Sequence, residues 1–379
     1  MPMGKIAYLN RLYSRMKFRS VDLKEKISGS SPPSVFVGRF GYPKVFVGPL
    51  VPPVHGDTMI MDFPESWLAK SRNDIIDFRF SLVRGKQSVN VREMNKTTEL
   101  LRQIALAKKS LDINAEFTKK PRGTFFREDI QPFGPSAPIK SIEVSNEKLE
   151  PRLEKAHYDT DLLARDAIVD LYSHDLPVST LQKAFSVGAF GLEANRKLVP
   201  TRWSITAVDS TLSSHLLDEI RSYPVLDTYQ VYEYNAMNTH FLILLLPTPW
   251  QYEMLEAFIK VLGNEELVFS DYELYKGRAD YASIGGCYYS GRLAIVEKLR
   301  AMKKQAGAIV FRESYPGYIP LGVWLVRECM RAALDGKPRE FADMKTAMSF
   351  ISSKLQLPIT RFRAASRLIK QSNLRQFWK

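Results

Sequence analysis

The chain has 379 residues, a length typical of two or three domains. Of these residues 45% are hydrophobic and 25% are charged, which is the composition of an ordinary globular protein. Its 54 Lys and Arg residues outnumber its 41 Asp and Glu residues, for a net charge of +13, which favours an anionic partner. No run of about 18 apolar residues predicts a transmembrane helix, and residues 1–20 lack the apolar core of a secretory signal. Nucleic acid is therefore a better partner than a membrane.

There are only two cysteines, Cys287 and Cys329. Two thiols this far apart in the sequence do not make a four-ligand zinc site by themselves. We expect both to be core thiols in a protein of the reducing cytoplasm.

Residues 1–33 are predicted to form a basic N-terminal arm and linker. The tetrapeptide Val-Phe-Val-Gly then occurs twice, at 35–38 and 45–48. Two β-branched and aromatic runs around a Gly/Pro segment predict a β-hairpin, which places Arg39 and Lys44 in or near its turn. Functional residues tend to gather in such loops.

The next part of the chain is predicted to be irregular. Apolar spacing indicates helices at 64–83, 94–109, 159–172 and 177–187, a short strand at 88–91 and a long polar loop at 128–158. Lys119, Lys120 and Arg122 precede Phe125 and Phe126, and cations beside aromatics suit single-strand binding. The alternative, a solvated loop beside core aromatics, agrees better with the usual burial of Phe.

Residues 200–221 are predicted to form a strand at 202–208, a tight turn at Asp209-Ser210 and a helix at 211–221. Asp209 or Ser210 is a suitable N-cap, although a strand-to-helix turn can also bind phosphate. The strand position predicts that Trp203 lies in the core.

The second half alternates between strand and helix patterns. We expect strands at 229–234, 240–246, 267–275 and 308–311, and helices at 249–262, 290–304, 320–334 and 340–355. The run at 240–246 is apolar enough for a central strand buried on both faces. This predicts a mixed α/β (α+β) fold, with an irregular sheet-and-helix main domain, a smaller helical or α+β C-terminal region and a flexible C-terminal tail.

The tail contains a short motif of Gln371, Leu374, Phe377 and Trp378. In a 3₁₀ turn Leu374 and Phe377 share one side, where with Trp378 they could fill an apolar pocket of a partner. This pattern resembles the PCNA-interacting peptide, by which repair and replication proteins dock on the sliding clamp. The alternative is an amphipathic helix whose aromatics fold back onto the body.

Several blocks together resemble the archaeal Nre family of DNA repair proteins, in its NreA branch. They are residues 36–49, 200–204, 285–289 and the tail. The resemblance implies a cytoplasmic archaeal protein that acts in DNA repair through the clamp. It also implies an N-terminal family region at 34–264, a C-terminal region at 265–357 and a basic linker with the clamp-binding tail at 358–379. Some relatives carry an N-terminal four-cysteine zinc motif, which this chain lacks before Cys287.

Catalytic motifs are sparse, with no Walker A loop and no H-E-x-x-H sequence. His55 and Asp57, with Asp62 nearby, could hold a metal that activates water, or could only fix their loop through turn hydrogen bonds. Arg202, the turn at Asp209 and Glu313 could serve a nucleotide-using transferase, or could be structural. No cofactor is assigned, and whether the protein is an enzyme stays open.

The sequence thus predicts a DNA repair factor that binds the sliding clamp by its tail and acts at damaged DNA. Its candidate DNA-binding cations are Arg39, Lys44, Lys119, Lys120, Arg122 and Arg202. One alternative is a DNA-processing enzyme, either a metal-dependent phosphodiester hydrolase or a nucleotide-using transferase. Another is an interaction scaffold that binds no DNA.

Overall fold

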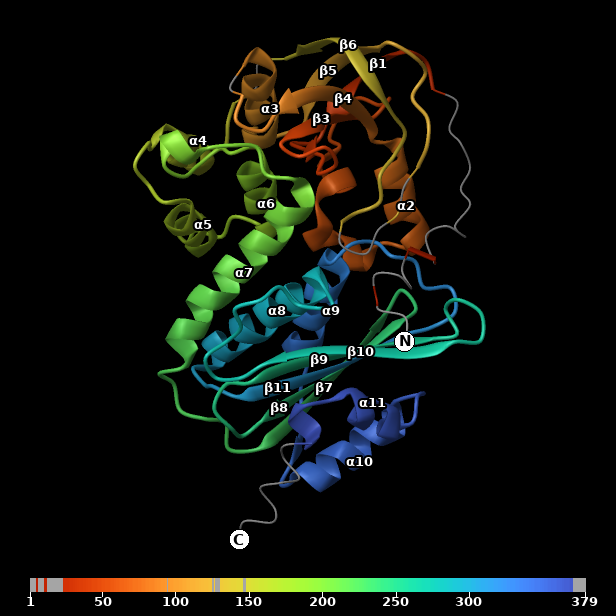
Figure 1. The fold of residues 1–379 in the computed structure, drawn as a ribbon, viewed down its shortest axis with the longest axis vertical. Coiled ribbons are helices and arrows are strands. Elements are labelled where there is room, and N and C mark those ends of the chain that lie inside the picture. The colour runs from red at the N-terminus through yellow and green to blue at the C-terminus, as the bar shows by residue number, and fades with distance from the viewer. Residues whose placement is uncertain are drawn as a thin grey trace. The chain divides into compact units, whose positions relative to one another are not determined.

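The computed structural model describes residues 5, 10–11, 23–93, 95–124, 126, 130–145 and 148–370. The chain divides into two compact units, the N-unit (Lys17–Leu212) and the C-unit (Ser213–Lys379 with Met1–Met16). Each unit contains a six-stranded sheet with both parallel and antiparallel neighbours, together with several helices (Figure 1). The predicted mixed α/β class is therefore confirmed.

The N-unit sheet has the strand order β1-β5-β6-β4-β3-β2. Only β4 and β6 run parallel, and the other neighbours are antiparallel. The duplicated tetrapeptide forms the predicted hairpin, because Val37 on β2 lies opposite Val47 on β3. The strands are β1 (Lys26–Ser31), β2 (Val35–Val37), β3 (Lys44–Val51), β4 (Val83–Asn90), β5 (Leu111–Phe117) and β6 (Ser136–Val144).

The N-unit helices mostly follow the predicted apolar spacing. In α3, Leu101 and Ile104 are buried, and the Asn95 side chain caps the first turn by accepting the backbone N–H groups of Thr97 and Thr98. The helices are η1 (Met59–Asp62), η2 (Pro64–Ala69), α2 (Arg72–Ser81), α3 (Lys96–Leu106), α4 (Pro151–Tyr158), α5 (Ala164–Ser173), α6 (Val178–Ser186), η3 (Glu193–Asn195) and the start of α7 (Thr201–Ile220).

Two N-unit predictions are wrong. The expected loop at 128–158 contains β6 and α4, because its polar sequence forms a half-exposed strand and a Pro-initiated helix. The expected strand and turn at 202–210 belong to the single helix α7. Ile205, Val208 and Leu212 are buried at helical spacing, so the helical period prevails over their β-branched composition.

The C-unit sheet has the order β10-β9-β11-β8-β7-β12. Strands β9 and β11 are parallel, and all other neighbours are antiparallel. The predicted strands at 229–234, 240–246, 267–275 and 308–311 are confirmed with shifted ends. The strands are β7 (Tyr229–Ala236), β8 (Thr239–Leu246), β9 (Tyr252–Ile259), β10 (Glu266–Glu273), β11 (Gly307–Ser314) and β12 (Arg339–Phe341).

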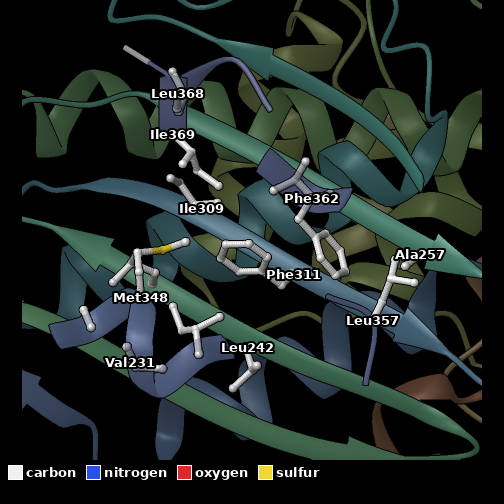
Figure 2. Close-up of a cluster of buried hydrophobic side chains, with 14 of the residues drawn as sticks. Val231, Leu242, Ala257, Ile309, Phe311, Met348, Leu357, Phe362, Leu368 and Ile369 are labelled. Carbon is white, nitrogen blue, oxygen red and sulfur yellow. The ribbon is translucent and has the colours of Figure 1, made fainter. Parts of the chain in front are cut away.

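Helices cover both faces of this sheet (Figure 1). Helices α8 (Gly286–Met302) and α9 (Trp324–Asp335) cover one face, and α10 (Met344–Lys354) and α11 (Ile359–Ala365) cover the other. On the α10–α11 side, Leu242 and Phe311 from the sheet join Met348 and Phe362 in one apolar cluster (Figure 2). Every residue of β8 is buried, as predicted for a central strand.

The predicted helix at 249–262 is wrong, because this segment contains strand β9 between β10 and β11. Glu253 and Glu256 of this strand are both fully buried. Glu256 pairs with Lys5 and, at 2.6 Å, with Arg312. Buried partners of this kind let a carboxylate occupy a central strand.

The structure also bears on membrane association. Within the described part of the chain, no helix combines the length and the apolar character needed to cross a bilayer.

Candidate functional site

A cavity of about 420 Å³ lies in the N-unit beside the β2–β3 hairpin. Strands β2, β3 and β4 supply one part of its lining, and the segments around Arg122 and Phe133 and the start of α7 supply the rest. The described lining residues are Phe36, Val37, Gly38, Arg39, Phe40, Phe46, Arg84, Lys86, Arg122, Gly123, Thr124, Ile130, Phe133, Ser136, Pro200 and Arg202.

Five of these residues are cationic, and none of those described is Asp or Glu. The lining is otherwise rich in aromatic rings, so positive charge stands against apolar walls. Low-dielectric walls strengthen the attraction of such charges for an anion. The cavity therefore suits a ligand that is both negatively charged and partly aromatic.

Arg84 lies on β4 between two phenylalanine rings. Its guanidinium carbon is 4.4 Å from the centroid of the Phe36 ring and 4.7 Å from that of Phe133. Its Nη2 donates to Ser136 Oγ at 3.5 Å, a weak bond, and its buried Nε has no hydrogen-bond partner within the described residues. Burial, and then repulsion by Arg79, lower the pKa of Arg84 to about 10. The site thus holds a cation without a carboxylate partner among those residues.

Lys86 lies two residues further along the same strand and therefore on the same face as Arg84. Burial lowers the pKa of Lys86, and the charges of Arg84 and Lys119 lower it further. No ion pair of Lys86 is formed with any of the described residues. An anion placed here would relieve the repulsion among these cations.

Asp62, a buried carboxylate of the N-unit, is already paired with cations. Asp62 accepts hydrogen bonds from Arg79 and Ser34, and Lys183 Nζ lies 3.8 Å from its Oδ2. Asp62, Arg79 and Lys183 line, together with Phe36, a separate small cavity of about 30 Å³, with room for water rather than for a ligand. Asp62 is therefore occupied with structural partners.

The start of α7 is joined to the hairpin strand. The Val37 N–H donates to Thr201 Oγ1 at 2.9 Å, which fixes the end of β2 against the first turn of the helix. Pro200 and Arg202 line the cavity at this point. The positive end of the helix dipole adds to the favourable potential for an anion.

The predicted cations are only partly brought together. Arg39, Arg122 and Arg202 line the cavity, and Lys119 lies close enough to Lys86 to lower its pKa. Lys44 and Lys120 are exposed and are not among the lining residues. Sequence reasoning missed Arg84 and Lys86, although their alternation along Val83–Asn90 is the pattern of one strand face.

The candidate metal ligands His55, Asp57 and Asp62 each have other partners in the fold. His55 Nδ1 lies 3.2 Å from Asp112 Oδ1, Asp57 accepts the N–H of Met59 in its own turn, and Asp62 is held by Arg79. Across the described residues, no three or more His, Cys, Asp or Glu side chains gather where they could hold a metal ion.

The second predicted constellation is also altered by the fold. Asp209 lies inside α7 rather than in a turn, is fully buried, and accepts a hydrogen bond from Gln182 Nε2 at 2.9 Å. Glu313 is fully buried on β11 and accepts the N–H groups of Gln356 and Leu357 at 2.9 and 2.8 Å. The turn expected at Asp209-Ser210, as an N-cap or as a phosphate-binding turn, does not form, because both residues lie inside α7.

The clamp-like motif of Gln371, Leu374, Phe377 and Trp378 lies outside the described residues. The segment just before it is anchored in the C-unit. Glu253 on β9 accepts the N–H groups of Arg367 and Leu368 at 2.6 and 3.1 Å. Leu368 and Ile369 are buried in the apolar cluster (Figure 2).

Comparisons with known proteins cover nearly the whole chain. The family models described as "Archaeal Nre, N-terminal" and "Archaeal Nre, C-terminal" match residues 4–261 and 273–377. The chain is 42% identical to the "DNA repair protein NreB" of Archaeoglobus fulgidus, over 95% of this chain and 93% of that protein.

Two further relatives carry the name "DNA repair protein NreA". The one from Archaeoglobus fulgidus is 36% identical over 89% of this chain and 88% of its own length. The one from Haloferax volcanii is 30% identical over 87% of this chain and 82% of its own length. No solved structure matches the chain significantly. The NreA branch stays a prediction, but the chain belongs to the archaeal Nre family.

Proposed function

We propose that this protein acts in DNA repair, that it holds DNA at the cationic cavity of the N-unit, and that it docks on the sliding clamp through its C-terminal tail. The observation that carries the proposal is the gathering of five cations around one aromatic-walled cavity, without an Asp or Glu among the described lining residues. The names of three relatives as DNA repair proteins support the role in repair.

Phosphate is the anion that best fits these cations. Arg84 and Lys86 have no carboxylate partner among the described residues, so a DNA phosphate would replace water rather than displace a protein side chain. Arg presents several N–H donors in a plane that match phosphate oxygens. Phosphate contacts of this kind give affinity without sequence preference and release counterions on binding.

The tail supports the second part of the proposal. Its Gln371, Leu374, Phe377 and Trp378 have the spacing of a clamp-binding peptide. The body ends in a segment fixed by Glu253 and the buried Leu368 and Ile369, so the peptide would leave the C-unit from a defined point. A peptide that carries its own aromatic anchors can dock without help from the body.

DNA binding is tested by fluorescence anisotropy with a labelled oligonucleotide at increasing salt. The expected result is an affinity that falls linearly on a logarithmic scale with salt concentration. Arg84→Gln with Lys86→Gln should weaken binding, and the matched control Lys108→Gln with Lys109→Gln, which removes two exposed charges away from the cavity lining, should not. No binding at low salt would contradict the proposal.

Clamp binding is tested separately by calorimetry with a purified archaeal sliding clamp. Deletion of residues 371–379, or Phe377→Ala alone, should abolish binding because the aromatic anchor is lost. The control Lys379→Ala should retain it. Unchanged clamp affinity after the deletion would remove this part of the proposal.

A further inference from the structure

Four large aromatic side chains stand exposed next to the cationic cavity. Phe40 is 69% exposed, Phe46 50%, Trp203 44% and Tyr42 43%. Phe40 and Phe46 line the cavity itself, Tyr42 lies in the same hairpin loop, and Trp203 follows the lining residue Arg202. Grouped exposed aromatics usually mark a binding surface, whereas single ones do not.

The contacts of these rings leave part of their surface uncovered. The Tyr42 and Trp203 centroids are 5.2 Å apart with their planes inclined by 52°, so they touch at an angle and do not cover each other by stacking. The Arg39 guanidinium carbon lies 4.7 Å from the centroid of the Phe40 ring, which pairs a cation with an exposed aromatic face. Because 43–69% of each of these four side chains is exposed, each offers ring surface to a further planar group.

Backbone hydrogen bonds brace the loop that carries Phe40 and Tyr42. Gly38 N–H donates to Phe46 O at 2.7 Å, Lys44 N–H to Gly41 O at 2.9 Å, and Val91 N–H to Pro43 O at 2.9 Å. Gly41 has a φ of 82°, a value that suits glycine and permits the tight turn. Preorganised rings lose little conformational entropy when a ligand binds them.

From these observations we propose that the cavity and its four flanking rings bind unpaired nucleotides of single-stranded DNA. This inference rests on the proposed DNA binding and names the form of DNA. Bases would stack on Phe40, Phe46 and the Tyr42–Trp203 pair, and the cations would bind the phosphates between them. Aromatic rings alternating with cations form the general arrangement by which proteins hold single strands without sequence preference.

Duplex DNA fits this surface less well. In a duplex both faces of each base are covered by neighbouring pairs, so aromatic side chains have nothing to stack against. The cavity, at about 420 Å³, has the size of a small-molecule site, which accommodates a nucleotide rather than a double helix. Arg84, between the Phe36 and Phe133 rings, lines this cavity and can donate to a phosphate or to a base edge.

The test compares three labelled ligands of equal length, about 20 nucleotides or base pairs each. They are a mixed-sequence single strand, its duplex, and a single strand of abasic residues that keeps the phosphates and lacks the bases. The single strand should bind roughly tenfold tighter than either of the others, because only it offers both free bases and phosphates. Equal affinity for the single strand and the duplex would overturn the inference.

Variants of the aromatic residues then test whether the rings cause the preference for the single strand. Phe40→Ala and Trp203→Ala should each weaken single-strand binding by roughly tenfold and leave the abasic strand unchanged, because only stacking is lost. Trp203→Phe should retain most of the affinity. The control Tyr158→Ala removes another exposed ring, on α4, and should have no effect. Unchanged single-strand affinity in both ring variants would contradict the inference.

The outcomes separate this inference from the proposed function. Salt-sensitive binding that is equal for all three ligands would leave DNA binding in place and remove the role of the rings. Failure to bind any of them at low salt would remove both. Tighter binding of RNA of the same sequence would overturn the assignment to DNA.

Discussion

The Arg84 guanidinium carbon lies 4.4 Å from the centroid of the Phe36 ring, and no carboxylate among the described residues accompanies it. A cation held against an aromatic face gains some attraction, but burial still lowers the pKa of Arg84 to about 10. The charged form is thus held at an energetic cost to the free protein. Functional sites commonly keep such groups because a ligand supplies the missing partner.

Arg84→Met should therefore separate stability from binding. Methionine keeps much of the packing between Phe36 and Phe133 and removes the buried charge, so the melting temperature should not fall. The affinity for DNA should fall roughly tenfold with the loss of one charge-assisted contact. Thermal denaturation and anisotropy measure the two quantities. A clear loss of stability with unchanged affinity would mean that Arg84 is purely structural.

Lys86 predicts a pH dependence of DNA binding. Burial, Arg84 and Lys119 lower its pKa in the free protein, and a nearby phosphate would raise it again in the complex. The complex then binds a proton that the free protein has lost, so affinity should fall as the pH rises through the free-protein pKa. Anisotropy between about pH 7 and about pH 10 should show this fall, and Lys86→Arg should remove it. If the affinity of the wild-type protein and that of Lys86→Arg changed with pH in the same way, Lys86 would not be the group that titrates.

Trp203 and Trp67 should differ in their contribution to folding. Trp203 is 44% exposed, whereas Trp67 is fully buried and donates its indole N–H to Ile60 O at 2.6 Å. Trp67→Ala should lower the free energy of unfolding by about 3–5 kcal/mol, and Trp203→Ala by less than about 1 kcal/mol. Urea denaturation followed by circular dichroism compares them. A large loss for Trp203→Ala would restore the core position that the sequence suggested.

Glu253 should control the segment that leads into the tail. Its carboxylate is fully buried and accepts Ser366 Oγ as well as the N–H groups of Arg367 and Leu368. Glu253→Ala leaves these donors without an acceptor and should cost about 3 kcal/mol or more. Hydrogen exchange should accelerate at 366–369, whereas the exposed Asp335→Ala should leave it unchanged. Unaltered exchange in Glu253→Ala would show that apolar packing alone holds the segment.

Much of the local structure was predictable because local signals agreed with the fold. The Val-Phe-Val-Gly repeat predicts the β2–β3 hairpin, and the all-apolar run at 240–246 predicts the central strand β8. The prediction of secondary structure fails where contacts between distant parts of the chain determine whether a segment is a helix or a strand. Strand β9 contains Glu253 and Glu256, whose buried partners come from distant parts of the chain and leave no trace in local periodicity.

The candidate site likewise contains some residues that the sequence predicted and others that only the fold reveals. Arg39 was predictable from its turn, Arg122 from its basic and aromatic neighbours, and Arg202 as a phosphate-binding Arg before a predicted turn. Only the folded N-unit brings the three to one cavity. Arg84 and Lys86 lie on a strand that the sequence predicted only at 88–91, so their shared face was missed. Trp203 was assigned to a core strand because its β-branched neighbours resemble one, whereas α7 exposes it.

The salt dependence of single-strand affinity in Arg84→Gln with Lys86→Gln tests the central claim most directly. If both cations contact phosphates, the slope of the logarithm of affinity against the logarithm of salt concentration should become shallower by about 1.4, at about 0.7 per lost contact. Lys108→Gln with Lys109→Gln should keep the wild-type slope. An unchanged slope in the cavity variant would contradict the account, because DNA would then bind elsewhere on the protein.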